Sequence, residues 1–279
     1  MKWNLVPDSS CDMLSTDLDE NIHLDVVPLT IVVGDKYFRD DENIDTKELL
    51  AAMKAEKRAS STACPSPRDF FEYFSKADCS IGFTLTGSLS GTYNAACLGR
   101  DMVREEFPEK KIHVVDTGAT AGKLVLLIRK ATELIKQGLE FEDVVQQLER
   151  YNKDTDLIFA LGGYDNMIKT GRMSRLAGVL ATNLGIRAVA RAVNGEVEVV
   201  KKPRGERAAI EAMIAFMEAK KPMKGRPIII THCNNPVGAM TAKLMMSEHF
   251  GTDPELITIM DCRGLTTFYT MQNGLIVAY

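Results

Sequence analysis

Short apolar runs alternate with longer amphipathic segments along the chain, and this alternation restricts the fold more than any other feature. Short runs rich in β-branched residues are typical of buried strands, whereas longer segments with a period of about 3.6 residues are typical of helices. Strands and helices that take turns in this way form sheets covered by helices. The sequence therefore predicts an α/β fold, and its 279 residues, 45% of them hydrophobic, are enough to fill large cores.

The first half of the chain is predicted to form a domain with a parallel sheet. The expected strands are Lys2–Val6, Leu24–Val33, Ser80–Thr86 and Lys111–Val115. The expected helices are Thr46–Lys57, Pro67–Ala77, Thr92–Phe107, Ala121–Gln137 and Phe141–Asn152. Polar loops follow three of the strands, at Asp8-Ser9-Ser10, Thr86 to Gly91 and Asp116-Thr117-Gly118. Because the carboxyl ends of parallel strands share one edge, these loops are expected to meet where α/β proteins bind ligands.

The second half is predicted to form another α/β domain. The charged stretch Lys153 to Asp156 places the boundary, so that the domains are 1–155 and 156–279. Asn194-Gly195 between two strand-like runs is a strong hairpin signal. The expected strands are Leu157–Gly162, Ile186–Val193, Glu196–Lys201, Arg226–His232, Glu255–Met260 and Leu275–Tyr279. The expected helices are Ser174–Asn183, Glu206–Ala219 and Gly238–Phe250.

Charge and hydropathy exclude several classes of partner. The net charge of −4 comes from 34 basic and 38 acidic residues spread along the chain, so no broad basic face for nucleic acid is expected. The apolar stretch before Asp8 is too short for the core of a signal peptide, and no later run approaches a membrane-spanning length. We therefore expect a cytoplasmic protein without an integral membrane segment.

The cysteines and histidines show no metal-binding pattern. The six cysteines include no CxxC pair, and the four histidines show no HExxH spacing. Scattered cysteines of this kind are expected to be buried thiols in a reducing compartment. We therefore expect no metal site, no disulfide and no cofactor.

The segment from Thr84 to Ala96 places hydroxyls and glycines between a strand and a helix. Such a turn offers free N–H groups, a helix dipole and hydroxyl donors to an anion, although an ordinary N-cap would use the same residues. A serine hydrolase or transferase working from Ser88 to Thr92 is the alternative. The nucleophile elbow Gly-x-Ser-x-Gly does not fit, because Leu89 stands midway between Gly87 and Gly91.

A second hydroxyl-rich loop runs from Ser60 to Pro67 and leads into a helix, with Pro67 suited to its first turn. The helix N-terminus could lower the pKa of the Cys64 thiol. No histidine lies nearby in the sequence, so a capped loop is favoured over a reactive thiol.

Six segments in order resemble the successive signatures of the DegV family, and together they cover the whole chain. They are Asp8 to Asp12, Pro28–Ile31, Gly34–Asp40, Thr62 to Pro67, Leu89 to Tyr93 and Lys169 to Ser174. The resemblance implies a two-domain α/β fold that holds a long-chain fatty acid in a tunnel and carries out no chemistry of its own. Some members are the FakB subunit of bacterial fatty acid kinase, which presents the acyl carboxylate to an ATP-using partner.

The resemblance also assigns roles to residues of this chain. Thr62 and Ser90 match the carboxylate-binding hydroxyls of the family, and the turn that includes Gly91 and Thr92 belongs to the same site. Arg172 matches an arginine associated with the partner surface. The partners implied are a long-chain fatty acid and an ATP-dependent fatty acid kinase, and transient contact with a membrane surface stays open.

The sequence departs from the family pattern at three places. Arg187-Ala188 stands where the family has Lys-Pro, and Ala63-Cys64 stands where it usually has Ser-Gln. The C-terminal His-x-Gly-Pro-Gly of the family falls on Tyr269 to Asn273, so Tyr269 takes the place of a histidine that joins the carboxylate site. We therefore expect Tyr269 to stand near the head group as a neutral phenolic donor, with packing in the core as the alternative.

Overall fold

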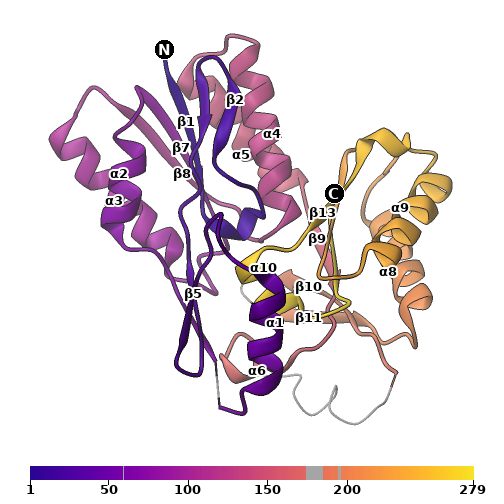
Figure 1. Cartoon of the computed structure of the whole chain (residues 1–279). Coiled ribbons are helices and arrows are strands. Elements are labelled where there is room, and N and C mark those ends of the chain that lie inside the picture. Colours follow the sequence, from indigo (N-terminus) through magenta and orange to yellow (C-terminus); the bar gives the residue numbers. More distant parts are fainter. Residues whose placement is uncertain (59, 174–184, 194–195) are drawn as a thin grey trace.

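The computed structural model describes residues 1–58, 60–173, 185–193 and 196–279 (Figure 1). Its first sheet has the strand order β2-β3-β1-β7-β8. All neighbours in it are parallel except the edge strand β2, which runs antiparallel to β3. The predicted parallel sheet is therefore present. Its strands are β1 (Trp3–Pro7), β2 (Thr16–Asp19), β3 (Ile22–Leu24), β7 (Cys79–Thr84) and β8 (Lys111–Asp116).

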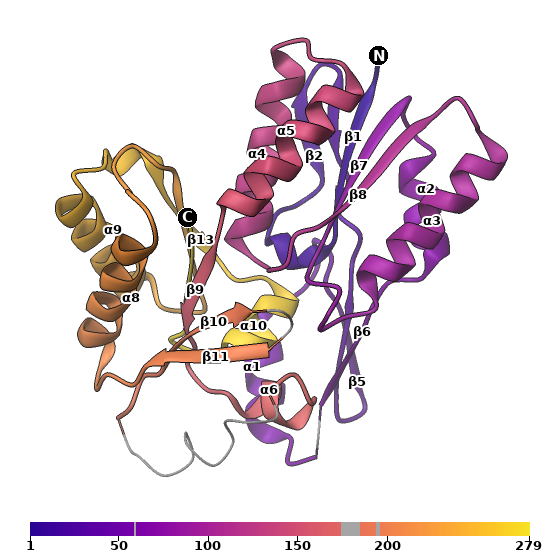
Figure 2. The ribbon, with the colours of Figure 1, turned by 180° about the vertical axis from the view of Figure 1, so that it is seen from behind.

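Two pairs of helices cover the faces of this sheet (Figure 2). On one face lie α2 (Pro67–Phe74) and α3 (Thr92–Glu106), and on the other lie α4 (Gly122–Lys136) and α5 (Phe141–Asp154). Ser66 and Asp69 form a capping box at the start of α2, where Pro67 occupies the first turn. Apolar residues at helical spacing then bury one side of each helix against the sheet.

The second sheet is mixed and has the strand order β11-β10-β9-β14-β12-β13. Its strands are β9 (Leu157–Ala160), β10 (Val189–Val193), β11 (Glu196–Lys201), β12 (Ile228–His232), β13 (Ile257–Asp261) and β14 (Leu275–Ala278). The helices α8 (Glu206–Lys220) and α9 (Pro236–Phe250) cover one face, and α4 packs on the other. A Cβ at Gly122 would lie 2.7 Å from the Cβ of Ile229, so glycine allows α4 to approach this sheet closely.

A small third sheet, with the order β5-β4-β6, joins the two halves of the chain. It consists of β4 (Thr30–Val33), β5 (Lys36–Arg39) and β6 (Ser61–Ala63), and it packs against α1 (Thr46–Ala55) and α10 (Gly264–Thr270). A short helix, α6 (Asp165–Lys169), lies near α10. Single turns of 3-10 helix occur at Ser9–Cys11 (η1) and Pro254–Leu256 (η2).

The sequence placed most elements correctly but was wrong about the strand Leu24–Val33. The chain stays bonded to the β1 segment as far as Val27 and enters the small sheet at Thr30, with Pro28 between them. Elements that the sequence did not reveal are β2, β5, β6, α6 and α10. The expected helix Ser174–Asn183 and the turn Asn194-Gly195 lie outside the described residues, although the strands flanking that turn do pair antiparallel. None of the helices in the described ranges is long and apolar enough to cross a membrane.

Candidate functional site

An apolar pocket lies between the first and second sheets and receives residues from both halves of the chain. It holds about 840 Å³ of empty space, its open mouth included. Its apolar wall comes from loops of the first sheet, from β9 and β14, and from α10. The apolar residues are Leu29, Leu85, Leu89, Ala119, Leu157, Phe159, Leu161, Met167, Ala192, Val197, Leu265 and Ile276.

One end of the pocket carries hydroxyl groups from three separate segments. Thr62 comes from β6, Ser90 from the loop before α3, and Tyr269 from α10. The Thr62 Oγ1 and the Tyr269 Oη are 3.1 Å apart, within hydrogen-bond distance. The ring of Tyr269 stacks edge-on against Phe268, with centroids 4.9 Å apart, which fixes the orientation of its hydroxyl. The structure therefore brings these three predicted site residues to one pocket.

The loop that carries Ser90 ends at the N-terminus of α3. Gly91 is the N-cap residue and provides no side-chain cap, so N–H groups of the first turn have no intrahelical partner. Thr92 is buried and does not line the pocket, but its Oγ1 lies 2.8 Å from the Oγ of Ser90 and holds that hydroxyl in place. The positive end of the helix dipole and the Ser90 hydroxyl are both suited to a negatively charged group.

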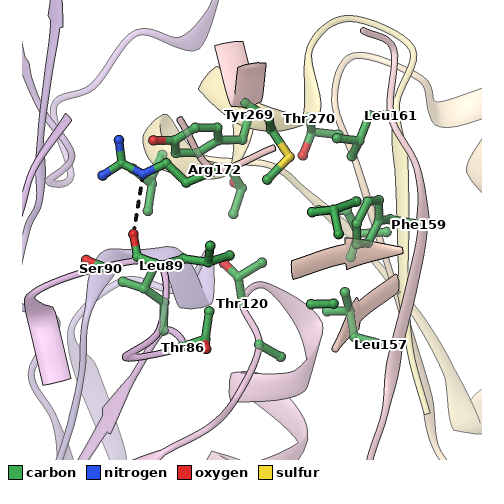
Figure 3. Close-up of a pocket in the computed structure, with 18 of the residues that line it drawn as sticks. Thr86, Leu89, Ser90, Thr120, Leu157, Phe159, Leu161, Arg172, Tyr269 and Thr270 are labelled. Atoms are coloured by element: carbon green, nitrogen blue, oxygen red, sulfur yellow. Dashed lines mark hydrogen bonds between the residues drawn. The ribbon is translucent and has the colours of Figure 1, made fainter. Parts of the chain in front are cut away.

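Arg172 also lines the pocket, next to Ser90 and Leu89 (Figure 3). Its Nε donates to the carbonyl of Leu89 at 3.3 Å, and its Nη1 donates to the carbonyl of Thr170 at 2.9 Å. These bonds hold a half-buried guanidinium at the pocket mouth, where it adds a positive charge to the hydroxyl groups. The side chain predicted as a partner contact therefore also faces the pocket.

Two buried carboxylates from the first half of the chain hold the first turn of α10. Asp40 accepts hydrogen bonds from the N–H groups of Gly264 and Leu265, each at 2.8 Å. Asp12 accepts from the N–H of Arg263 at 2.7 Å and from the hydroxyl of Thr266. These contacts determine where α10 lies, and therefore where the Tyr269 hydroxyl points.

Asp8 has a similar role for the loop between β7 and α3. Its carboxylate accepts from the N–H and the hydroxyl of Ser10 and, through the other oxygen, from the N–H of Leu85 at 2.7 Å. The N–H of Thr86 donates to the carbonyl of Ala119, which follows β8. The polar loops after β1, β7 and β8 therefore meet at one edge of the sheet, as predicted.

Burial sets the protonation of these carboxyl groups. It raises the pKa of Asp12 to about 8, against the opposing effect of the hydrogen bonds from Thr266 and the Arg263 N–H. It raises the pKa of Asp8 to about 6 and also raises the pKa of Asp40. Burial therefore favours the protonated form of Asp12 far more than it is favoured in a carboxyl group exposed to water.

Several pocket residues were not found by sequence reasoning. Leu157, Phe159 and Leu161 line the pocket from one side of β9 and its extension, and this period of two was visible in the predicted strand. Thr86, Thr120 and Thr270 also line it. Thr270 lies on α10, which the sequence did not reveal.

The cysteines are only partly as expected. Cys11, Cys79, Cys233 and Cys262 are buried and Cys97 is half-buried, but Cys64 is exposed, and the expectation of a buried thiol was wrong there. It stands beside the turn at Gly91, where a Cβ would lie 3.4 Å from its sulfur. The loop from Ser60 to Pro67 crosses the protein surface at this point, so the residue after β6 is left in solvent.

The fold and the pocket define a class of α/β proteins in which an apolar pocket with a polar mouth lies between two large sheets. The sequence model of the DegV family, described as uncharacterised, matches residues 2–267, and the chain belongs to this family. A DegV domain-containing protein of Streptococcus pyogenes serotype M1 is 36% identical over 282 residues, with 100% of this chain and 99% of that protein covered. The family resemblance read from the motifs is confirmed.

Solved structures of relatives have the same fold. The fatty acid kinase (Fak) B3 protein of Streptococcus pneumoniae, loaded with linoleic acid, is 35% identical and has a TM-score of 0.94, with 100% of this chain and 99% of that chain covered. A DegV family protein of Eubacterium eligens, loaded with heptadecanoic acid, is 28% identical and has a TM-score of 0.92, with 99% and 98% covered. The predicted α/β fold class is thereby confirmed over the full chain.

Proposed function

We propose that this chain binds one long-chain fatty acid in the pocket between its two sheets. The observation that carries the proposal is the pairing of a long apolar wall with a single mouth where Thr62, Ser90 and Tyr269 converge. A ligand that matches this pocket has an apolar chain and one polar, negatively charged end. The relatives crystallised with linoleic and heptadecanoic acids support this ligand class.

The apolar chain supplies the affinity. Burial of sixteen or so methylenes at ~0.8 kcal/mol each provides roughly 13 kcal/mol of gross driving force. Association costs about 4–15 kcal/mol in lost motion. A chain of this length therefore binds tightly only when nearly all of it is buried, and the wall formed by residues such as Leu85, Phe159 and Ile276 offers that burial.

The mouth determines the orientation of the ligand. A carboxylate leaves water at a cost of several kcal/mol unless hydrogen-bond donors receive it. We assign this role to the hydroxyls of Thr62, Ser90 and Tyr269, with Gly91 supplying the helix N-terminus and Thr92 supporting Ser90. The guanidinium of Arg172 stands beside them and compensates the negative charge.

In this proposal the chain is a non-catalytic carrier that presents the carboxylate to an ATP-dependent fatty acid kinase in the cytoplasm. The membership of the Streptococcus pneumoniae relative in a fatty acid kinase supports that partner. Arg172, which reaches the mouth, is the residue we assign to the partner contact. We further propose that the chain divides into domains 1–155 and 156–279, with the fatty acid held between them.

A serine hydrolase is the less favoured alternative. The hydroxyl of Ser88 lies 2.7 Å from that of Thr86, and the hydroxyl of Ser90 is bonded to Thr92. None of the four histidines lines the pocket, so neither serine has a histidine base beside it there. The hydroxyls are arranged as donors to a ligand.

Native mass spectrometry of protein purified from a bacterial host tests the proposal. We expect a fatty acid bound in a ratio of about one to one, because a deeply buried chain is released slowly. Organic extraction identifies the acid. Repeated recovery of ligand-free protein that takes up no added fatty acid would contradict the carrier function.

A further inference from the structure

The hydroxyl of Thr270 differs from the other hydroxyls of the pocket. Those of Thr62, Thr86 and Ser90 each have a hydroxyl partner within 3.1 Å. Thr270 is only 1% exposed, and its Oγ1 has no hydrogen-bond partner within the described part of the chain. Buried polar groups are nearly always hydrogen-bonded, so an unpaired one inside a ligand pocket points to a partner on the ligand.

Thr270 lies away from the proposed head-group site. Figure 3 shows it beside Leu161, across the pocket from Leu89 and Ser90, with its oxygen directed into the pocket. The neighbouring wall, which includes Leu161 and Phe159, is apolar. A fatty acid with its carboxylate at Ser90 would therefore pass Thr270 with its hydrocarbon chain.

A nearby thiol is only a weak partner for this hydroxyl. Burial raises the pKa of the Cys262 thiol well above its usual range, and the hydroxyls of Thr266 and Thr270 oppose that shift. A thiol is only a weak hydrogen-bond partner. A hydroxy or oxo group in the pocket would therefore be a stronger partner for the Thr270 hydroxyl than this thiol is.

We propose that Thr270 selects fatty acids that carry an oxygen substituent, a hydroxy or an oxo group, on their hydrocarbon chain. The inference rests on the proposed fatty-acid binding and specifies which acids the pocket prefers. A plain chain leaves the Thr270 hydroxyl unpaired in the complex, whereas a hydroxy or oxo group pairs with it. Sites that hold a buried polar group discriminate against ligands that cannot bond to it.

Competition binding among 18-carbon acids tests the proposal, with stearic acid, oleic acid and a set of hydroxystearic acids that differ in the position of the hydroxyl. At least one hydroxystearic acid is expected to bind the unmodified protein about five- to tenfold more tightly than stearic acid, the effect of one net hydrogen bond. Thr270→Val, which keeps the branched shape, is expected to abolish this preference, measured as the ratio of the hydroxystearic to the stearic acid affinity in the same variant. Thr270→Ser, which keeps the hydroxyl, is the matched control and is expected to retain the preference.

The outcomes separate this inference from the proposed function. If stearic and oleic acids bind but no hydroxystearic acid is preferred, or if the preference survives in Thr270→Val, the role of Thr270 is overturned and fatty-acid binding stands. A preference for oleic acid alone also overturns it. If none of the acids binds, both proposals fail. The comparison within the unmodified protein does not depend on how the variants fold.

Discussion

Replacement of Tyr269 by phenylalanine examines the head-group site most directly. The variant removes one hydroxyl, whose oxygen lies 3.1 Å from the Thr62 Oγ1, and keeps the ring that stacks against Phe268. A hydrogen bond to a charged acceptor contributes about 1.5–3 kcal/mol, so we expect a roughly 10- to 150-fold loss of fatty-acid affinity. Because the ring packing is retained, the melting temperature is expected to change little.

Titration of delipidated protein with a fluorescent fatty acid measures this loss, and Thr62→Val in single and double variants shows whether the two hydroxyls act together. Since they bond to each other, the double variant is expected to lose less than the sum of the single losses. Tyr269→His provides a second readout, because histidine changes charge between pH 5 and 8 and should introduce a binding transition there. Normal binding by the phenylalanine variant, together with a flat pH profile for the histidine variant, would place Tyr269 outside the site.

Four further changes examine neighbouring features. Ser90→Ala is expected to weaken fatty-acid binding by about 1–3 kcal/mol at unchanged fold, measured by the same titration, and unchanged affinity would move the carboxylate elsewhere. Arg172→Ala should reduce phosphorylation by a kinase partner at saturating fatty acid more than it reduces affinity, and the opposite ranking would reject the partner contact. The raised pKa of Asp12 means that the folded protein holds an extra proton between about pH 4 and 8, so its contribution to stability falls as pH rises through that interval. In urea unfolding, the free energy of unfolding of Asp12→Asn should therefore depend less on pH in this interval than that of the unmodified protein. Parallel pH profiles of the two proteins would contradict this. Met271 adopts a φ of 56°, so Met271→Gly should relieve backbone strain and raise the free energy of unfolding by roughly 1 kcal/mol in the same assay, and an unchanged or lower value would contradict this.

The sequence identified the mouth of the pocket because its residues lie in short, distinctive motifs. Thr62 and Ser90 each stand in a hydroxyl-rich loop next to a helix, and such loops can be recognised from a short stretch of sequence. The alignment of Tyr269 to Asn273 with a glycine-containing motif is supported by positive φ angles at Met271 and Asn273, where the family has glycines. Met271 and Asn273 therefore adopt backbone conformations that favour glycine although neither residue is a glycine.

The helix α10 could not be predicted in the same way. Its sequence, Gly264 to Thr270, is rich in threonine and aromatic residues, which favour strands over helices. The helix forms because Asp40 and Asp12, more than 220 residues away, accept the N–H groups and the hydroxyl of its first turn. Local propensity does not contain that information, so Thr270 and its unpaired hydroxyl were not found.

The attachment of α10 to Asp12 and Asp40 has a consequence for the order of events during folding. The helix lies more than 220 residues after Asp12 and Asp40 in the chain, so it is synthesised well after them. Contacts between such distant segments form slowly, because a long loop must close before they are made. The first sheet, whose strands all lie between Trp3 and Asp116, can assemble before then, but the wall that carries Tyr269 and Thr270 cannot. The nascent protein therefore becomes able to hold a ligand only when the segments around Asp12 and Asp40 have met α10.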